Sequence, residues 1–244
     1  MKVKDYLLEK MAAGTIHMTL IDPDKQAPER AAAIAADAEA LGTDAIMIGG
    51  STDITQKNLD ETAVAIKGSV SIPVIYFPSG AHALSANCDA LYFMSMLNSR
   101  DVRMVIREQA MAAPIVKKLG IEPISMGYII VEPGMKVGEV GKADLIRRDD
   151  PMSAVGYALA AEYLGMDLVY LEAGSGADMP VPSEMVGAVK GLTSIPLIVG
   201  GGIRSAEAAK AAKDAGANAV VTGTLVEVDG YLQELEAVIT SVKS

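Results

Sequence analysis

The 244-residue sequence is poor in the residues that build disulfide frameworks and zinc sites. It has one cysteine, Cys88, so an intrachain disulfide scaffold is excluded and a reducing cytoplasm is expected. The two histidines, His17 and His82, lie far apart and belong to no Cys/His cluster, which argues against a zinc site. Charge, proline or glycine interrupts every apolar run well short of the ~18 residues that a membrane span needs. We therefore expect a cytoplasmic protein without a secretory signal or transmembrane segment.

Basic residues are also scarce relative to acidic ones. The chain has 21 Lys and Arg against 31 Asp and Glu, a net charge of −10, and a pI of about 4.7. Because there is no basic stripe, nucleic acid is excluded as a partner. Half of the residues are apolar, enough to bury a full core and to exclude a disordered chain. We expect a single domain spanning residues 1–244.

Short apolar runs alternate with longer alanine-rich segments along the chain. The runs are apolar throughout rather than alternating, which is typical of strands in a parallel sheet covered on both faces. The helical segments that we name are 28–41, 101–119, 153–164 and 205–215. The eight expected strands are 15–22, 45–48, 73–77, 90–94, 124–131, 167–171, 196–199 and 219–222.

A repeat supports a count of eight strand–helix units. Leu-Gly-Thr-Asp at 41–44 and Leu-Gly-Met-Asp at 164–167 each open a strand, and each glycine precedes the serine of a Ser-Ile-Pro by 29 residues. The copies lie 123 residues apart, so we predict two halves that close into a (βα)8 barrel, with an open doubly wound sheet as the alternative. Segment 78–89 is too short and too weakly periodic for a regular third helix. Segment 132–151 has the composition of a long polar loop, as in lids and binding loops.

Active sites of such barrels lie at the carboxyl ends of the strands. Gly200-Gly201-Gly202 follows the seventh expected strand, and Gly223-Thr224 follows the eighth. Glycines let backbone N–H groups approach an anion, and the last two loops are the usual phosphate site of this fold. Gly174-Ser175-Gly176, after the sixth strand, would widen this cradle. The pattern favours phosphate binding over ordinary tight turns.

Two carboxylates stand at predicted strand ends. Glu172 can accept a hydroxyl proton or bind a polyol, although an ion pair with a basic neighbour is the alternative. Asp22 begins Asp22-Pro23-Asp24-Lys25 and suits Mg²⁺ held together with substrate phosphates. A helix cap or turn is the other interpretation, and it fits Asp24 better. Ser51 offers a further hydroxyl ligand or, alternatively, a helix cap.

Seven segments, spread in order across nearly the whole chain, resemble the geranylgeranylglyceryl phosphate synthase family and its heptaprenylglyceryl phosphate synthase relatives. The pairing of Tyr-Leu-Glu with Gly-Gly-Gly-Ile is the specific part of the resemblance. The segments are Leu20–Lys25, Ile48–Ser51, Leu97–Ser99, Gly127–Ile130, Tyr170–Gly176, Gly200–Ile203 and Val221–Thr224.

The resemblance implies a modified (βα)8 barrel that lacks a regular third helix. It implies a Mg²⁺-dependent prenyltransferase that joins sn-glycerol 1-phosphate to geranylgeranyl diphosphate in archaeal-type membrane lipid synthesis. By this likeness Asp22 and Ser51 bind Mg²⁺. The residues expected around glycerol phosphate are Tyr170, Leu171, Glu172, Ala173, Gly174, Ser175, Gly176, Gly201, Gly202, Gly223 and Thr224.

The prenyl chain needs an apolar groove, for which Tyr128, Met94 and Met96 are candidate wall residues. The Ala- and Met-rich helices favour a homo-oligomer. The chain departs from some family members at Leu20, where they have lysine, and at Glu132-Pro133-Gly134, where they have Asn-Pro. A heptaprenylglyceryl phosphate synthase, a phosphate-binding barrel isomerase or lyase, and a non-catalytic binder of lipid or phosphorylated metabolites remain as alternatives.

Overall fold

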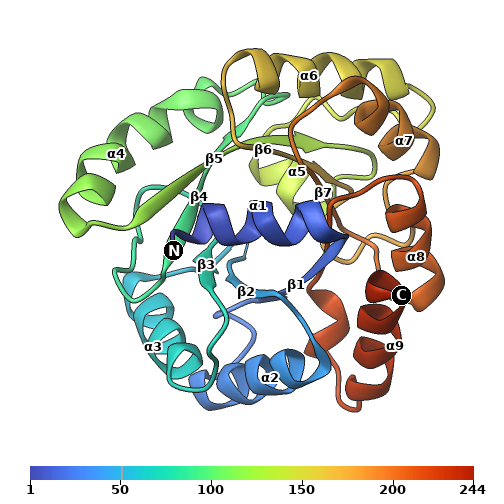
Figure 1. The fold of residues 1–244 in the computed structure, drawn as a ribbon. Coiled ribbons are helices and arrows are strands. Elements are labelled where there is room, and N and C mark those ends of the chain that lie inside the picture. Colours follow the sequence, from blue (N-terminus) through green and yellow to red (C-terminus); the bar gives the residue numbers. More distant parts are fainter. Residues whose placement is uncertain (51) are drawn as a thin grey trace.

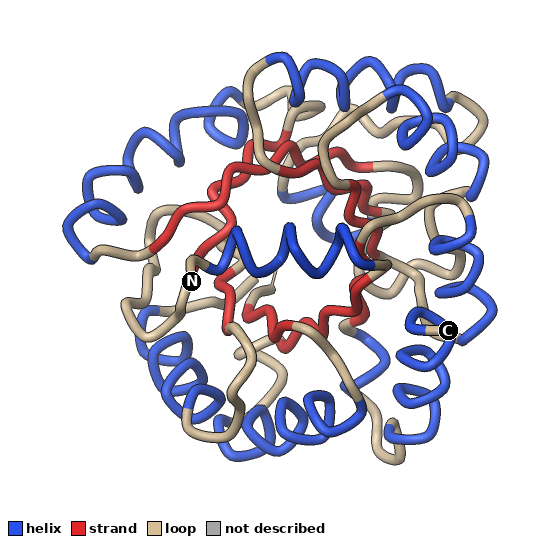
Figure 2. Tube along the Cα trace, viewed as in Figure 1, coloured by secondary structure: helices blue, strands red, loops and turns tan. Residues whose placement is uncertain are grey.

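Eight parallel strands form a closed barrel in the computed structural model, which describes residues 1–50 and 52–244. Each strand pairs with its neighbours in chain order, and β8 returns to pair with β1, which gives the ring of strands seen in Figure 2. The predicted (βα)8 barrel is therefore confirmed over the open sheet. The strands are β1 (Ile16–Ile21), β2 (Ala45–Ile48), β3 (Val74–Tyr76), β4 (Ala90–Met96), β5 (Glu122–Ile130), β6 (Leu168–Glu172), β7 (Leu197–Gly200) and β8 (Ala219–Thr222).

Helices surround the barrel, except between β3 and β4 (Figure 1). There, residues 78–89 form only turns and bends, so the missing third helix is confirmed. A π-helical turn, η1 (Arg103–Arg107), leads into the helix after β4. The helices are α1 (Val3–Ala13), α2 (Pro28–Leu41), α3 (Gln56–Lys67), α4 (Glu108–Leu119), α5 (Met135–Val140), α6 (Pro151–Tyr163), α7 (Ser183–Leu192), α8 (Ala206–Asp214) and α9 (Leu232–Lys243), with a short 3-10 turn, η2 (Thr224–Glu227).

The four helices named from the sequence are present as α2, η1 with α4, α6 and α8. The bounds of α2 are those expected, and ends of the other three are shifted by one or two residues. The interpretation of 132–151 as one long loop was incomplete, because this segment contains α5. Because α5 is only six residues long and contains Gly138, it lacks the apolar periodicity that marks longer helices. No helix in 1–50 or 52–244 has the length and apolar character to cross a bilayer.

The predicted half-barrel repeat has a structural counterpart at the start of β2 and β6. The Asp44 carboxylate accepts a hydrogen bond from the backbone N–H of His17 at 3.0 Å. Asp167 accepts one from the N–H of Ser125, also at 3.0 Å. In each half, the aspartate of the repeated tetrapeptide thus ties the preceding strand to the next one.

A glutamate makes a second repeated contact. Glu39 on α2 accepts from the N–H of Ser71 at 3.0 Å, and Glu162 on α6 accepts from the N–H of Ser194 at 2.8 Å. Both serines belong to the Ser-Ile-Pro segments that lead into the next strand of their half. The spacing repeat therefore marks equivalent positions in two similar half-barrels.

Apolar side chains fill two layers. One lies inside the barrel, where Met18, Met47 and Tyr92 are fully buried, and the other lies between the strands and the surrounding helices. Burial on both faces explains why the strands are continuously apolar in sequence. Such packing supplies most of the driving force for folding.

The amino end of the barrel is closed by α1, which crosses the ring in Figure 1. Leu7 and Met11 of this helix belong to the inner core layer. The backbone N–H groups of Val3 and Lys4 donate to Glu122 at the start of β5, at 2.8 and 3.0 Å. Since α1 covers this end, ligands have access to the barrel at the carboxyl ends of the strands.

His17 is a buried titratable side chain in the outer layer. The His17 ring bonds Thr43 Oγ1 through Nδ1 at 2.8 Å and Thr222 Oγ1 through Nε2 at 3.0 Å. Burial lowers the pKa of His17 from 6.5 to about 3, so the imidazole is neutral in the folded protein. His17 is therefore a buried side chain whose two ring nitrogens both have hydrogen-bond partners.

We expect His17→Gln to reduce the sensitivity of the fold to acid. Below pH 6.5 only the unfolded chain binds a proton on His17, so wild-type stability falls by about 1.4 kcal/mol per pH unit from this group. Glutamine does not titrate. The unfolding free energy of wild type minus that of the variant, measured in urea titrations, should therefore decrease from about pH 7 to about pH 4. A constant difference would contradict the assignment.

Candidate active site

A hollow of about 1120 Å³ lies at the carboxyl ends of the strands. Asp22 after β1, Glu172 at the end of β6 and Gly223 after β8 all line it. Gly201, after β7, lies with Glu172 and Gly223 around a smaller adjoining hollow of about 350 Å³. The structure thus brings together at one mouth four residues that are up to 201 positions apart in the sequence.

Glu172 is buried at the junction of the two hollows, with 7% of its surface exposed. Its Oε1 accepts a hydrogen bond from the N–H of Gly174 at 2.6 Å, and the Tyr170 and Tyr128 hydroxyls also favour the charged carboxylate and lower its pKa. Burial raises the pKa of Glu172 from 4.5 to about 7, against the effect of these donors. A carboxyl poised near neutrality can gain and lose a proton during a reaction.

The backbone beside Glu172 requires glycine. Gly201 has φ +80°, and a Cβ atom there would overlap Glu172 Oε1. Gly202 has φ +72° and lies against the backbone of Met179. Side chains at these positions would fill the space where the strand-end loops approach a ligand.

The smaller hollow has the features of an anion cradle. Ser175 Oγ and Thr224 Oγ1 are 3.0 Å apart and link the loops after β6 and β8. Arg204 donates to the carbonyl oxygen of Gly176 at 2.6 Å and thereby holds the β6 loop. Glycine-rich loops with hydroxyl groups suit a phosphate. The predicted residues that line the smaller hollow are Tyr170, Glu172, Ser175, Gly201, Gly202, Gly223 and Thr224.

Other predicted cradle residues contribute differently. The Leu171 and Ala173 side chains are fully buried in the outer layer between strands and helices, away from the hollow. This follows from the alternation of side chains along β6, where Tyr170 and Glu172 face the barrel interior. Gly174 supplies its N–H to Glu172, and Gly176 its carbonyl oxygen to Arg204. These four residues therefore shape the site and do not line it.

Asp22 follows β1, the strand that pairs with β8 in the ring. Its Oδ1 accepts the N–H of Asp24 at 3.0 Å, and Lys25 Nζ lies 3.9 Å from Oδ2. Burial raises the pKa of Asp22. A Cβ atom at Gly50 would overlap both carboxylate oxygens, so glycine there leaves them accessible.

The donor set at Asp22 fits a hard divalent cation that shares its ligands with a substrate. Among the described residues, no group of three or more His, Cys, Asp and Glu side chains is arranged to hold a metal. Mg²⁺ is commonly bound by one or two carboxylates together with substrate phosphates, so one aspartate at the mouth is sufficient. The second expected ligand, Ser51, lies outside the described residues.

Sequence reasoning missed Glu227 in η2. Its carboxylate accepts from Lys25 Nζ at 2.7 Å, and both side chains line the main hollow. Glu227 follows the Gly223-Thr224 turn by three residues, so its place after a strand end was the available signal. Lys25 and Lys136 are the two cationic side chains among the described residues that line this hollow.

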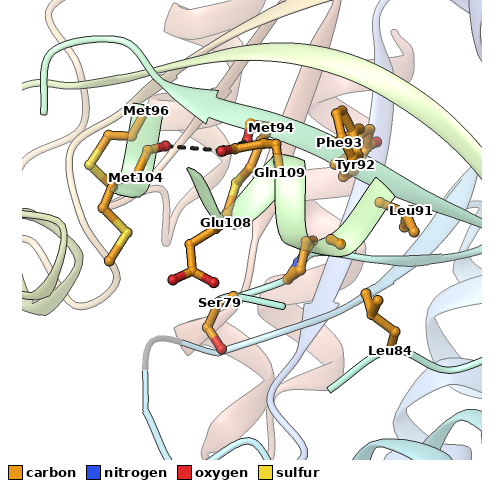
Figure 3. A pocket seen from close by; sticks show the side chains of 13 residues that line it. Ser79, Leu84, Leu91, Tyr92, Phe93, Met94, Met96, Met104, Glu108 and Gln109 are labelled. Atoms are coloured by element: carbon orange, nitrogen blue, oxygen red, sulfur yellow. Dashed lines mark hydrogen bonds between the residues drawn. The ribbon is translucent and has the colours of Figure 1, made fainter. Parts of the chain in front are cut away.

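A second, apolar hollow of about 510 Å³ lies where the third helix is missing (Figure 3). Met94, Met96 and Met104 line both this hollow and the main one, so the two are contiguous. Tyr128 lines the main hollow as well. Of the three predicted groove residues, Met94 and Met96 thus line both hollows and Tyr128 lines the main one. Further lining residues of the apolar hollow include Leu84, Leu91, Tyr92, Phe93 and Ala112.

Residues 6–243 match the family model described as the PcrB family. The chain belongs to the PcrB family. Geranylgeranylglyceryl phosphate synthase of Methanococcoides burtonii is 52% identical over 246 residues, covering 100% of both chains. The enzyme of the same name from Thermococcus gammatolerans is 51% identical over 233 residues, covering 96% of this chain and 92% of the relative. The resemblance identified from the motifs is thereby confirmed.

A crystal structure also matches this PcrB-family chain. It is (S)-3-O-geranylgeranylglyceryl phosphate synthase from Thermoplasma acidophilum in complex with substrate sn-glycerol-1-phosphate. The TM-score is 0.97 at 47% identity, and the match covers 100% of this chain and 99% of the other. The modified barrel is thus the fold of solved relatives.

Replacing Glu172 with glutamine should remove turnover and make the fold less sensitive to alkaline pH. The protonated carboxyl contributes stability below pH 4.5, and this contribution is lost as pH rises through about 7. We therefore expect the stability of Glu172→Gln relative to wild type to increase by about 3 kcal/mol between about pH 4 and about pH 8. Urea unfolding at both pH values measures the change, and equal slopes with pH would disprove it.

Proposed function

We propose that the protein is a prenyltransferase that joins sn-glycerol 1-phosphate to geranylgeranyl diphosphate through an ether bond and releases diphosphate, in archaeal-type membrane lipid synthesis. The observation that carries this proposal is the position of Glu172 at the junction of the phosphate-type cradle and the main hollow. That main hollow is contiguous with the apolar one. An acceptor phosphate, a proton acceptor and a lipid chain can thus meet at one place.

In this proposal the acceptor phosphate lies on the glycine loops after β6, β7 and β8. Ser175 and Thr224 hydroxyls face this cradle and are suited to bond phosphate oxygens. Glu172, in the same hollow, is within reach of a glycerol hydroxyl. Fixing the hydroxyl against a carboxylate before reaction lowers the entropic part of the barrier.

The reaction forms one C–O bond and breaks another. The glycerol hydroxyl oxygen bonds to C1 of the prenyl group, and its proton moves to Glu172. The electron pair of the broken C–O bond leaves with the diphosphate. The Tyr128 and Tyr170 hydroxyls orient the Glu172 carboxylate for this transfer.

The leaving diphosphate needs positive charge around it. Asp22 and, by family likeness, Ser51 would hold a divalent cation, with Mg²⁺ as the expected ion. Mg²⁺, when bound, neutralises the charge that develops on diphosphate. Lys25 and Lys136 lie on the same hollow and supply further positive charge to diphosphate oxygens.

The prenyl chain occupies the apolar hollow beneath α4 in this proposal. Methionine side chains at its entrance are flexible and polarisable, which suits a long unsaturated chain. The apolar lining of this hollow also disfavours water near the reacting carbon. Prenyl diphosphates of graded length, assayed with glycerol 1-phosphate and analysed by product mass, test the activity. Preference for a heptaprenyl donor would assign the alternative family activity, and isomerisation without donor would reject both.

Asp22→Asn should lower turnover by at least about 100-fold, because one carboxylate charge on the cation is lost. The dependence of rate on Mg²⁺ concentration should shift to higher values. Asp24→Asn is the matched control, since Asp24 is exposed and does not line the hollow. Equal losses in both variants would show that the turn, and not the metal ligand, is affected.

Ala112→Phe should fill the apolar hollow and raise KM for geranylgeranyl diphosphate at least about tenfold, with KM for glycerol 1-phosphate unchanged. A shorter donor should be affected less. Ala110→Phe, on the exposed side of α4, is the control for a phenylalanine added to this helix. Circular dichroism checks that both variants fold. If the donor KM stays at the wild-type value in folded Ala112→Phe, the chain binds elsewhere.

A further inference from the structure

Helix α4 presents an unusually apolar surface to solvent. Of its twelve residues only Ala112 and Val116 are buried. Met111 is 59% exposed, Ile115 43% and Leu119 40%. Their spacing of four residues aligns them along one side of the helix. In Figure 1 this helix stands at the periphery of the ring, beside the sector without a third helix.

Positive charge flanks this apolar stripe. Arg107 precedes Met111 by four residues, and Lys118 follows Ile115 by three, so both lie on the same side of the helix. Within the described residues, neither Arg107 nor Lys118 makes an ion pair. Segment 100–119 has five basic and two acidic residues, a net charge of +3 in a chain of net charge −10.

The opposite side of α4 lines the apolar hollow. Met104 of η1 and Gln109 and Ala112 of α4 face it, as Figure 3 shows for the first two. Gln109 Nε2 donates to the carbonyl oxygens of Met94 and Met104, at 2.5 and 3.0 Å, and ties the helix start to β4. One short element thus separates solvent from the hollow proposed for the prenyl chain.

We propose that this face of α4 docks on the surface of an anionic lipid bilayer. Apolar side chains between basic ones are the pattern of helices that lie in a membrane interface. Arg107 and Lys118 would contact lipid phosphates while Met111 and Ile115 enter the acyl boundary. A two-fold contact between copies through this face would instead oppose basic groups to basic groups. The docking itself does not rest on the proposed function. Exchange of prenyl substrate or product between the bilayer and the hollow does rest on it.

Co-sedimentation with vesicles tests the docking. The vesicles contain phosphatidylcholine with about one third phosphatidylglycerol, or phosphatidylcholine alone. We expect wild type to sediment with the anionic vesicles, and to be released at about 1 M salt. Arg107→Glu with Lys118→Glu should lower partitioning at least about tenfold. Met111→Ser with Ile115→Ser should do the same by removing apolar contact.

Matched controls lie elsewhere on the ring. Leu164→Ser with Leu192→Ser removes two exposed apolar side chains next to α6 and on α7, and Lys57→Glu with Lys210→Glu reverses two charges on α3 and α8. These variants should bind vesicles like wild type. All variants should convert a short, water-soluble prenyl diphosphate in the absence of vesicles at the wild-type rate.

Three results would overturn the docking proposal. The first is wild type that does not sediment with anionic vesicles, and the second is an equal loss of vesicle binding in the α4 and control variants. The third is a mass of the α4 variants in light scattering below that of wild type, which would assign the surface to self-association. Measuring turnover in solution separates a failure of the docking proposal from a failure of the proposed function. Ether product without vesicle binding rejects only the docking, whereas vesicle binding without product rejects only the reaction.

Discussion

Closure of the barrel by the pairing of β8 with β1 is the constraint on which the site depends. Residues 16–19 pair in register with residues 219–222, so the first and last strands of the chain become neighbours. Because all eight strands are parallel, their carboxyl ends meet at one rim. The register places Asp22 and Gly223 on the same hollow. Without this pairing, the two ends of the chain would contribute to separate surfaces.

Within that rim, opposing effects act on the charge of the Glu172 carboxylate. Burial disfavours its charge, whereas the N–H of Gly174 and two tyrosine hydroxyls favour it. The balance leaves its pKa near neutrality. The tyrosines are themselves fixed by aromatic packing, with the Tyr128 and Tyr170 ring centroids 5.3 Å apart. The inner core of the barrel and the chemistry of its mouth are therefore parts of one packed unit.

The sequence predicted those structural features that depend on a local pattern of residues. Continuous apolar runs located all eight strands, and position after a strand placed Asp22, Glu172 and the glycine turns at the mouth. Side-chain direction was harder: Leu171 and Ala173 share the Tyr170–Gly176 segment yet face the outer core. The α5 helix and the Glu227–Lys25 pair were missed, because short helices and contacts across 202 residues leave no periodic signal.

The absence of a helix between β3 and β4 has a consequence for how this fold can diversify. The cradle that we propose for the glycerol phosphate is built by β6, β7 and β8, whereas the apolar slot proposed for the prenyl chain is built by β4, α4 and segment 78–89. The two sectors are separate in sequence and share only the rim. Substitutions in one sector can therefore adjust which hydrocarbon is accommodated while the polar recognition in the other is preserved. Under the proposed function, recognition of the lipid tail and of the headgroup can therefore evolve independently.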